Sequence, residues 1–389
     1  MSKKRGGVAV ATLSTFCEIR RSRSRKAKIA AGTIYEIDSK LMQKKLTVGV
    51  LFGGRSGEHE VSLVSATSII NALDRQKYDI VSIGVTKSGK WFSSSDVLAL
   101  FKEGKTPAPE NEVTIIADPT RKGLYNLKTG KNIHIDVIFP IIHGTFGEDG
   151  TVQGLFDLAG IPYVGAGVLG SSVGMDKIIQ KDMARNAGID VTSYIWFLKN
   201  DFKKSPDETI KWIETEIGYP CFVKPANSGS SVGINKSHNR NELKAHLNEA
   251  INYDRRIIVE KGVENAKEIE ISILGNDRPI ASVCGQIISS NEFYDYNAKY
   301  VDGKSKAVIP ADLPNDIAIK IKEIAIKIFK ILDTAGMTRT DFLVTKDNVY
   351  FNEINTIPGF TSISMYPKLF EKSGIPYKEL LDSLINLAL

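Results

Sequence analysis

The stretch 337–355, MTRTDFLVTKDNVYFNEIN, contains the pattern on which the fold prediction rests. Two extended runs, 338–344 and 349–355, are rich in β-branched and aromatic residues, which favour strands. The triplet between them, KDN at 346–348, has the composition of a turn. The stretch therefore predicts a β-hairpin centred on Asp347.

This hairpin would bring oxygen-bearing side chains together. With the turn centred on Asp347, Asp341 faces Glu353 and Arg339 faces Asn355. Strand alternation also places Arg339 with Asp341, and Glu353 with Asn355, on the same face. Like charges on cross-strand partners are destabilising, so the two carboxylates need a cation. An all-oxygen set suits Mg²⁺ or Mn²⁺, and the alternative is a structural ion network in which Arg339 alone neutralises the pair.

A second candidate site lies upstream, where Lys224-Pro225 closes a predicted strand. The loop that follows, NSGSSVG at 227–233, is made of small residues whose N–H groups and hydroxyls can surround phosphate oxygens. The alternative is a flexible polar loop, but Lys224 before it favours phosphate binding. A phosphate loop and a metal hairpin in different regions imply a nucleotide held between two domains. The turn Pro358-Gly359 beside the metal could supply an oxyanion hole through its amides.

Two other glycine-rich stretches do not fit a nucleotide site. The stretch 84–90 nearly matches a P-loop, but Trp91 stands where Ser or Thr would hold Mg²⁺. Its sequence reads as a hairpin turn between strands. The stretch 53–57 lacks the G-x-G-x-x-G spacing of a dinucleotide fingerprint.

Strand and helix patterns alternate in the first part of the chain. The run 46–54 is predicted to be a buried strand that ends in a glycine turn, with further strands at 80–85, 113–116 and 135–142 and a helix at 61–73. This alternation indicates a parallel α/β sheet, with Glu58 and His143 at the carboxyl ends of its strands. Helical segments then flank 175–187, and short strands surround the loop at 225–233. From residue 257 the pattern favours antiparallel strands around one strong helix, 315–333, which Gly336 ends.

The fold class predicted is α/β and α+β, with the chain divided into four regions. They are a basic N-terminal extension (1–45), an N-terminal α/β domain (46–164), a central α+β domain (165–256) and a C-terminal mixed-sheet domain (257–389), with the nucleotide between the last two. No apolar run is long enough to span a membrane. The scattered cysteines suggest no disulfide framework and fit a reducing, cytoplasmic compartment.

The net charge of +6 comes from the N-terminal extension. Residues 1–46 hold 12 Lys/Arg against 3 acidic residues, and the remaining 343 residues hold 39 Lys/Arg against 42 acidic residues. The body of the chain therefore lacks the charge of a nucleic-acid-binding protein. Residues 1–45 can be an upstream extension with Met42 as the real start, an organelle transit peptide, or a nucleic-acid arm. We exclude them from the fold under every one of these readings.

The ordered set of motifs resembles the ATP-grasp ligases, and within them the D-alanine–D-alanine ligases of peptidoglycan synthesis. The motifs are GGRSGEHEVS (53–62), HG with GEDG (143–150), MDK (175–177), KP with its loop (224–233), FYDYNAKY (293–300) and Arg339 through Ser364. Residues 1–45 have no counterpart. The resemblance implies a ligase that uses ATP and two Mg²⁺ or Mn²⁺ ions to activate one D-alanine as an acyl phosphate. The amine of a second D-alanine then displaces phosphate.

The resemblance also implies residue roles. The implied catalytic residues are Glu58, Ser230, Tyr300, Arg339 and Gly359. Those implied to bind the amino-acid substrates are His143, Lys299, Ser364 and Met365. Those implied to bind ATP are Lys177, Lys224, Ser231, Glu260, Lys261, Val263, Glu268 and Phe293. The metal ligands are Asp341, Glu353 and Asn355, in agreement with the hairpin argument.

Among close relatives, a tyrosine at Tyr300 goes with dipeptide formation, so the resemblance implies a dipeptide product and a lid at 292–304. It also implies a homodimer with small-molecule substrates and no nucleic-acid or membrane partner. The rival interpretations are an ATP-grasp ligase for another amino acid or peptide, and a nucleotide-binding module without catalysis. Arg339 and the complete set of metal ligands speak against the second.

Overall fold

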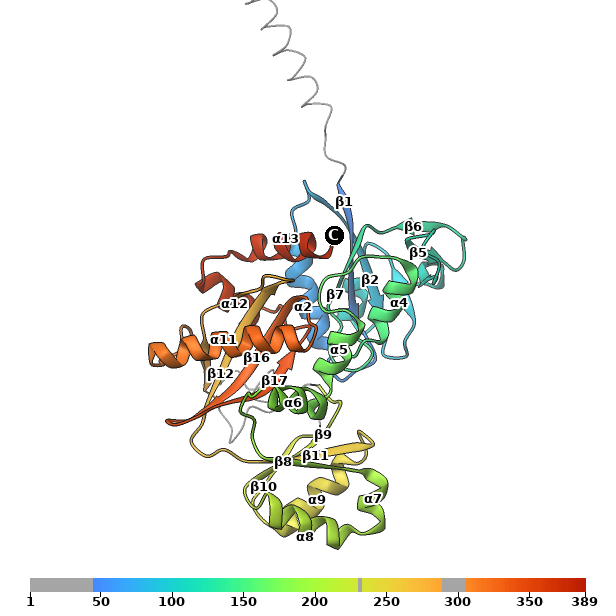
Figure 1. The fold of residues 1–389 in the computed structure, drawn as a ribbon. Helices are drawn as coiled ribbons and strands as arrows, with labels where there is room; N and C mark the ends of the chain where they lie inside the picture. Colours follow the sequence, from blue (N-terminus) through green and yellow to red (C-terminus); the bar gives the residue numbers. More distant parts are fainter. Residues whose placement is uncertain (1–44, 230–232, 289–305) are drawn as a thin grey trace, which may run out of the picture. The chain divides into compact units, whose positions relative to one another are not determined.

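The computed structural model describes residues 45–229, 233–288 and 306–389. Residues 46–389 form one compact unit. Among the described residues, no helix combines the length and apolarity that crossing a membrane requires. Three sheets form within the described ranges, and each is flanked by helices (Figure 1).

The first sheet has the strand order β6-β5-β4-β3-β2-β1-β7. Its strands are β1 (Leu46–Gly53), β2 (Tyr78–Val85), β3 (Trp91–Ser93), β4 (Glu112–Ile115), β5 (Gly123–Asn126), β6 (Asn132–His134) and β7 (Val137–Pro140). Only β2-β1-β7 are parallel, and β2 through β6 pair antiparallel. The predicted parallel sheet is therefore correct at its centre and wrong at its edge. There, tight turns such as 86–90 join successive strands, and a tight turn permits only antiparallel pairing.

The turn after β2 shows that the stretch resembling a P-loop is a hairpin turn. Thr86 N–H donates to Lys90 O over 2.9 Å, and Gly89 has the positive φ of +92° that the turn needs. The stretch is a β2–β3 hairpin, as predicted, and a strand rather than a helix follows the turn directly. The first sheet is covered by α2 (His59–Ala72), α3 (Val97–Lys102), a 3₁₀ turn (Pro109–Asn111) and α4 (Thr151–Ala159).

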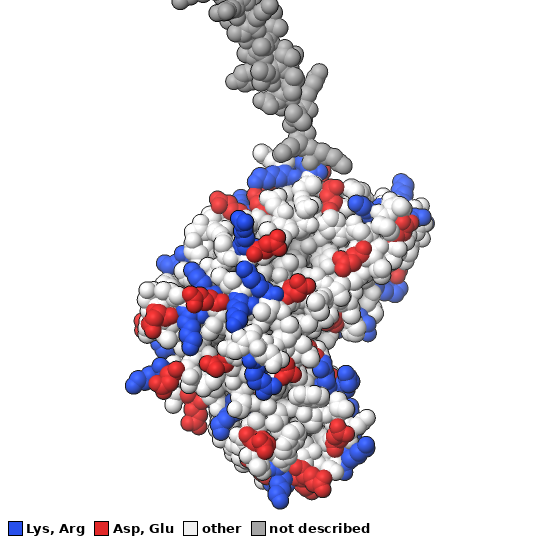
Figure 2. All heavy atoms as spheres, in the orientation of Figure 1, with Lys and Arg blue, Asp and Glu red and all other residues white. Residues whose placement is uncertain are grey.

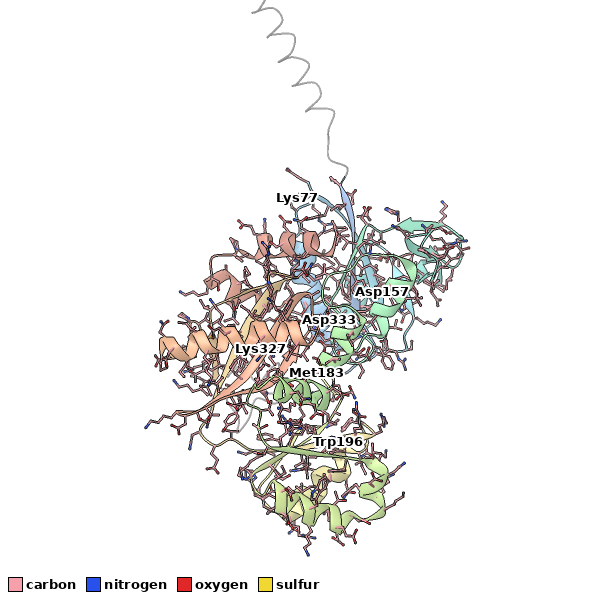
Figure 3. The ribbon with its side chains drawn as sticks, in the orientation of Figure 1. Lys77, Asp157, Met183, Trp196, Lys327 and Asp333 are labelled. Carbon is pink, nitrogen blue, oxygen red and sulfur yellow. The ribbon has the colours of Figure 1, made fainter. Side chains whose placement is uncertain are left out.

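The C-terminal helix α13 (Tyr377–Ala388) also packs on the first sheet. Asp382 in α13 accepts a hydrogen bond from Tyr78 Oη over 2.9 Å and pairs with Lys77 Nζ at 2.6 Å. Lys77 is labelled in Figure 3. Leu381 and Leu384 of the helix lie in one apolar core with Val48 of β1. The last helix of the chain thus holds the first strand in place.

The second sheet has the order β10-β9-β11-β8. Its strands are β8 (Tyr194–Leu198), β9 (Cys221–Pro225), β10 (Asn235–Ser237) and β11 (Arg256–Lys261), and its helices are α7 (Lys199–Lys204), α8 (Pro206–Glu216) and α9 (Arg240–Ala250). Because β11 pairs with both β9 and β8, it belongs to this sheet. The boundary between the central and C-terminal domains, which we expected at residue 257, is therefore better drawn after Lys261.

The third sheet has the order β15-β14-β12-β16-β17, with β13 paired to β12. Its strands are β12 (Lys267–Gly275), β13 (Ile280–Ala281), β14 (Gly285–Ile288), β15 (Lys306–Val308), β16 (Gly336–Val344) and β17 (Val349–Asn355). The helices α5 (Val168–Met175), α6 (Lys177–Asn186), α11 (Asn315–Ile331) and α12 (Met365–Lys372) lie against it. Helix α11 ends before Gly336, because Asp333 takes the left-handed conformation (φ +53°) and Gly336 already opens β16.

The β16–β17 hairpin has the predicted pairs but not the predicted turn. Asp341 faces Glu353 and Arg339 faces Asn355. The register shifts after Asp341, however, so that Phe342 faces Phe351. The turn therefore has one residue more than the predicted triplet, and a bulge at Asn352 compensates for it. The pairing at the site end of the hairpin is confirmed.

Positive and negative side chains are mixed on the face of the molecule that Figure 2 shows. On the face that Figure 2 shows, Lys and Arg side chains alternate with Asp and Glu side chains, without a broad area of one sign. This agrees with the nearly balanced charge of residues 47–389.

Candidate functional site

Arg339, Asp341 and Asn355 form a connected polar group on the hairpin. Arg339 donates from Nε and Nη2 to the two carboxylate oxygens of Asp341, over 2.8 and 2.7 Å. Asn355 Nδ2 donates to Asp341 Oδ2 over 3.2 Å. A carboxylate has about four acceptor positions, so Asp341 can bind Arg339 and still offer lone pairs to a cation.

A residue that the sequence analysis missed completes this group. Glu270 of β12 lies directly opposite Asp341, and its Oε2 is 3.1 Å from Arg339 Nε. Burial alone would lower the pKa of Arg339, but Asp341 and Glu270 raise it well above its usual range. Arg339 thus contacts carboxylates from two strands. The alternation of Glu268 and Glu270 along β12 could have indicated that both share the site face.

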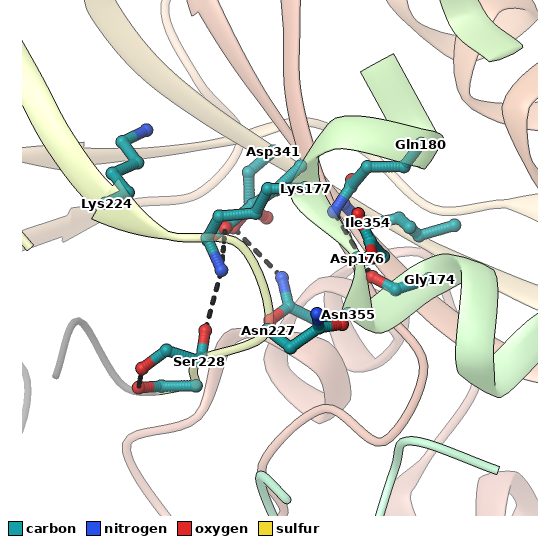
Figure 4. Close-up of polar contacts among 12 residues, drawn as sticks. Gly174, Asp176, Lys177, Gln180, Lys224, Asn227, Ser228, Asp341, Ile354 and Asn355 are labelled. Atoms are coloured by element: carbon teal, nitrogen blue, oxygen red, sulfur yellow. Dashed lines mark hydrogen bonds and ion pairs between the residues drawn. The ribbon is translucent and has the colours of Figure 1, made fainter. Parts of the chain in front are cut away.

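Lys177, the first residue of α6, connects the phosphate loop to the hairpin. Its Nζ donates to Ser228 O over 2.6 Å and lies 3.8 Å from Glu353 Oε2 (Figure 4). Asp176 fixes the start of this helix by accepting hydrogen bonds from the N–H groups of Ile178 and Ile179. The predicted loop and the predicted metal ligands are therefore adjacent.

Gln180, one turn further along α6, was also missed. Its Oε1 accepts the N–H of Ile354 over 2.9 Å, and its Nε2 donates to Gly174 O over 3.2 Å (Figure 4). Ile354 stands between Glu353 and Asn355 on the outer strand of the third sheet. Gln180 thus satisfies a backbone N–H at the edge of the sheet, as a neighbouring strand would. It also links the strand that carries the two predicted ligands to the helix that carries Lys177.

A cavity of about 420 Å³ lies between the second and third sheets. Its lining includes most of the residues predicted for ATP and metal: Lys224, Glu260, Lys261, Val263, Glu268, Asp341 and Glu353. Phe222, Ile269 and Leu343 add apolar walls. The volume and the mixture of apolar walls with converging charges suit a small polar ligand.

Glu260 of β11 is shared by two lysines at the back of this cavity. Its Oε2 lies 3.1 Å from Lys224 Nζ and 3.4 Å from Lys181 Nζ, and it accepts from Thr192 Oγ1 over 3.3 Å. Burial alone would raise the pKa of Glu260, but Lys181 and Lys224 lower it below its usual range. Glu260 is therefore held as a carboxylate. Lys181 was not predicted as a site residue.

Glu58 lies between the first sheet and the phosphate loop. It directly precedes α2 without a capping hydrogen bond from its side chain, and its Oε2 would be 2.6 Å from a Cβ atom on Gly229 and 2.8 Å from one on Gly144. Only glycine leaves room for the carboxylate at these two positions. Glu58 is nearly fully buried and reaches the loop that precedes the predicted Ser230.

His143 and Glu148 hold the segment that follows the hairpin. His143 Nδ1 bonds to Ile357 O at 3.0 Å, and its Nε2 has no hydrogen-bond partner among the described residues. Glu148 accepts the N–H of Gly144 over 2.7 Å. Burial, with the nearby charge of Glu58 as the second cause, raises the pKa of Glu148 to about 8. Glu148 stands in a quoted motif, but the sequence analysis gave it no role.

Gly359, Ser364 and Met365 lie together at the start of α12. A Cβ atom on Gly359 would be 2.7 Å from Ser364 Oγ, and that hydroxyl accepts the N–H of Thr361 over 3.0 Å. Met365 is buried against Ile287 and Leu369. Ser364 is therefore close to the predicted oxyanion amide, whereas Met365 belongs to the core.

The remaining predicted site residues lie outside the described ranges. They are Ser230, Ser231, Phe293, Lys299 and Tyr300. Within the described ranges, no group of three His, Cys, Asp or Glu side chains is placed to hold a metal ion. The donor set Asp341, Glu353 and Asn355 still fits Mg²⁺ or Mn²⁺, because these ions need only one or two carboxylates when phosphate and water supply the rest.

A sheet pair that encloses a cavity with a lysine at the end of one strand and paired carboxylates on another defines an ATP-grasp protein. Solved structures agree. The chain aligns with the VanG D-Ala:D-Ser ligase from Enterococcus faecalis with a TM-score of 0.79 and 36% identity, over 89% of this chain and 100% of that one. It aligns with the D-alanine-D-alanine ligase from Coxiella burnetii with a TM-score of 0.76 and 37% identity, over 88% and 94%.

The chain belongs to the D-alanine–D-alanine ligase family. Family models for the D-ala D-ala ligase N-terminus and C-terminus match residues 47–166 and 183–386. The D-alanine–D-alanine ligase of Natranaerobius thermophilus is 53% identical over 349 residues, which is 89% of this chain and 95% of that protein. The enzyme of the same name from Heliobacterium modesticaldum is 50% identical, with the same coverage.

Proposed function

We infer that this chain is an ATP-dependent ligase that joins two D-alanine molecules into D-alanyl-D-alanine for peptidoglycan synthesis, the activity of its family. The observation that supports this most is the meeting of Asp341 and Glu353 across the hairpin, in the wall of the cavity that also contains Lys224. ATP and a divalent metal are the family's cofactors. We propose Mg²⁺ or Mn²⁺, and two ions, held by Asp341, Glu353 and Asn355.

ATP would lie in the cavity between the second and third sheets. Lys261 and Val263 would border the adenine, Glu268 the ribose, and Lys177 and Lys224 the phosphates. Bound metal ions would neutralise charge on the terminal phosphates during transfer of the γ-phosphoryl group. The chain's own contribution is to hold the phosphates with fixed ammonium groups and to align them with the acceptor carboxylate.

The first D-alanine would place its ammonium group against Glu58, with its carboxylate facing the γ-phosphate. Attack by that carboxylate gives D-alanyl phosphate and ADP. The amine of the second D-alanine then attacks the acyl carbon, and phosphate leaves. Arg339 and the Gly359 amide would stabilise the oxyanion of the tetrahedral intermediate. His143 would lie beside the first substrate, and Ser364 beside the second.

The product would be a dipeptide. This proposal rests on Tyr300, which we expect to act with Ser230 and Glu58, and Lys299 would contact the second substrate. Because the second substrate is what separates related ligases, Tyr300→Phe should gain activity with D-lactate. An assay in which this variant still forms only dipeptide would remove Tyr300 from that role. We further propose a homodimer in the cytoplasm.

The test is phosphate release from ATP by the full chain. D-alanine should support release only with Mg²⁺ or Mn²⁺, and L-alanine should not support it. D-serine and D-lactate, offered together with D-alanine, measure the choice of second substrate by mass spectrometry of the product. Equal rates with D- and L-alanine would overturn the assignment. Phosphate release without any amino acid would indicate an ATPase instead.

A further inference from the structure

Lys181 has no part in the mechanism above, yet it is the most buried of the lysines around the nucleotide cavity. Its side chain is 1% exposed, against 7% for Lys177 and 11% for Lys224. A buried ammonium group is costly unless a counter-charge compensates it. The ion pair with Glu260 at 3.4 Å supplies that charge, and Lys181 Nζ makes no hydrogen bond among the described residues.

Glu260 thus forms two ion pairs through the same carboxylate oxygen. Its Oε2 faces both Lys181 and Lys224, while its Oε1 is buried without a hydrogen-bond partner among the described residues. Two ammonium groups on one carboxylate exceed what its charge requires. The two lysines also differ in position, because Lys224 lines the cavity and Lys181 does not. Only Lys224 can turn from Glu260 toward a ligand in the cavity.

We propose that Lys181 is a positioning residue, a fixed counter-charge for Glu260 that releases Lys224 to bind the nucleotide's phosphates. This inference rests on the proposed function, which places phosphates at Lys224. Without Lys181, Lys224 would be the remaining described cation within 4 Å of Glu260. Its departure would then leave a buried carboxylate uncompensated, which is strongly unfavourable. Lys224 would stay with Glu260, and the phosphates would lose their partner.

The experiment compares two ligands on the full chain by isothermal titration calorimetry, ADP with MgCl₂ and adenosine. The ratio of the two dissociation constants measures the phosphate contribution alone. In Lys181→Met the affinity for ADP should fall by about tenfold or more, with the affinity for adenosine unchanged. Lys211→Met, an exposed lysine on α8, is the matched control and should keep both affinities.

The double variant Lys181→Met/Glu260→Gln gives the sharpest test. Glutamine removes the charge that retains Lys224, so the ADP-to-adenosine ratio should return toward that of the unmodified chain. If Lys181 were merely structural, adding Glu260→Gln would not be expected to restore this ratio. If Lys181→Met does not fold, the double variant and Lys181→Gln carry the same comparison.

The outcomes separate the two proposals. Equal losses for ADP and adenosine in Lys181→Met, or a double variant whose ratio stays low, would overturn the role of Lys181. An unmodified chain that binds ADP no more tightly than adenosine would instead overturn the placement of phosphates at Lys224.

Discussion

The proposed nucleotide side of the site and the proposed D-alanine side hold their carboxylates by different means. On the nucleotide side, Glu260, Asp341 and Glu353 lie 3.1, 2.7 and 3.8 Å from a lysine or arginine nitrogen. On the D-alanine side, Glu148 is buried and accepts a backbone N–H, and its pKa is raised to about 8. Ion pairs keep a carboxylate charged and able to exchange one cation for another, whereas burial pushes it toward the neutral acid.

Arg339 tests the nucleotide side with the largest expected effect. Arg339→Met should lower the rate of phosphate release by about 10²–10³-fold, because it removes a donor to the developing oxyanion. Arg339→Lys keeps the charge but not the paired geometry, so it should lose less. The measurement is the turnover number, with the melting temperature recorded for both variants. A lysine variant as active as the unmodified chain would mean that Arg339 only balances the charges of Asp341 and Glu270.

Substitution of two buried glutamines, one on each side, tests whether the two sides are independent. Gln180 accepts the N–H of Ile354 beside the proposed metal ligands, and Gln153 of α4 makes a similar pair of bonds to Gly147 O and Gly150 N, over 2.8 and 3.1 Å. Gln180→Leu should raise the Mn²⁺ concentration needed for half saturation by about tenfold, measured by Mn²⁺ binding in electron paramagnetic resonance.

Gln153→Leu should leave Mn²⁺ binding unchanged and raise KM for D-alanine instead. Each variant thus serves as the control for the other. If both changed the same quantity, the two sides would not be independent.

Glu148 tests the D-alanine side through the pH dependence of stability. Its pKa is about 8 in the folded chain against an ordinary 4.5, so the folded state binds a proton that the unfolded state releases. The contribution of protonated Glu148 to the free energy of unfolding is full below pH 4.5 and is lost as the pH rises through 8. From pH 6 to 9 the unmodified chain should lose on the order of a few kcal/mol relative to Glu148→Gln. Urea denaturation at each pH measures this, and parallel curves would contradict it.

Removing residues 1–45 should have the smallest effect. The described residues of the site all lie within the compact unit 46–389. A chain that starts at Leu46 should therefore keep its turnover number within about twofold. A larger loss would mean that the extension takes part in folding or catalysis.

The sequence predicted the hairpin site well because its information is local. Strand alternation and a short turn suffice to place Asp341 opposite Glu353 and Arg339 opposite Asn355. The turn was one residue longer than predicted, and only a bulge at Asn352 restored the pairing. Sequence alone could not show that compensation, because a bulge depends on the packing of both strands.

Only the tertiary structure decided the contacts between segments that are far apart in the chain. Lys181 to Glu260, Gln180 to Ile354 and His143 to Ile357 join residues separated by 79, 174 and 214 positions. Residue type and spacing sufficed to propose the chemistry of the site, namely lysines for phosphate and oxygen ligands for a metal. Which groups brace them follows from how the sheets and helices pack, and no local periodicity encodes that.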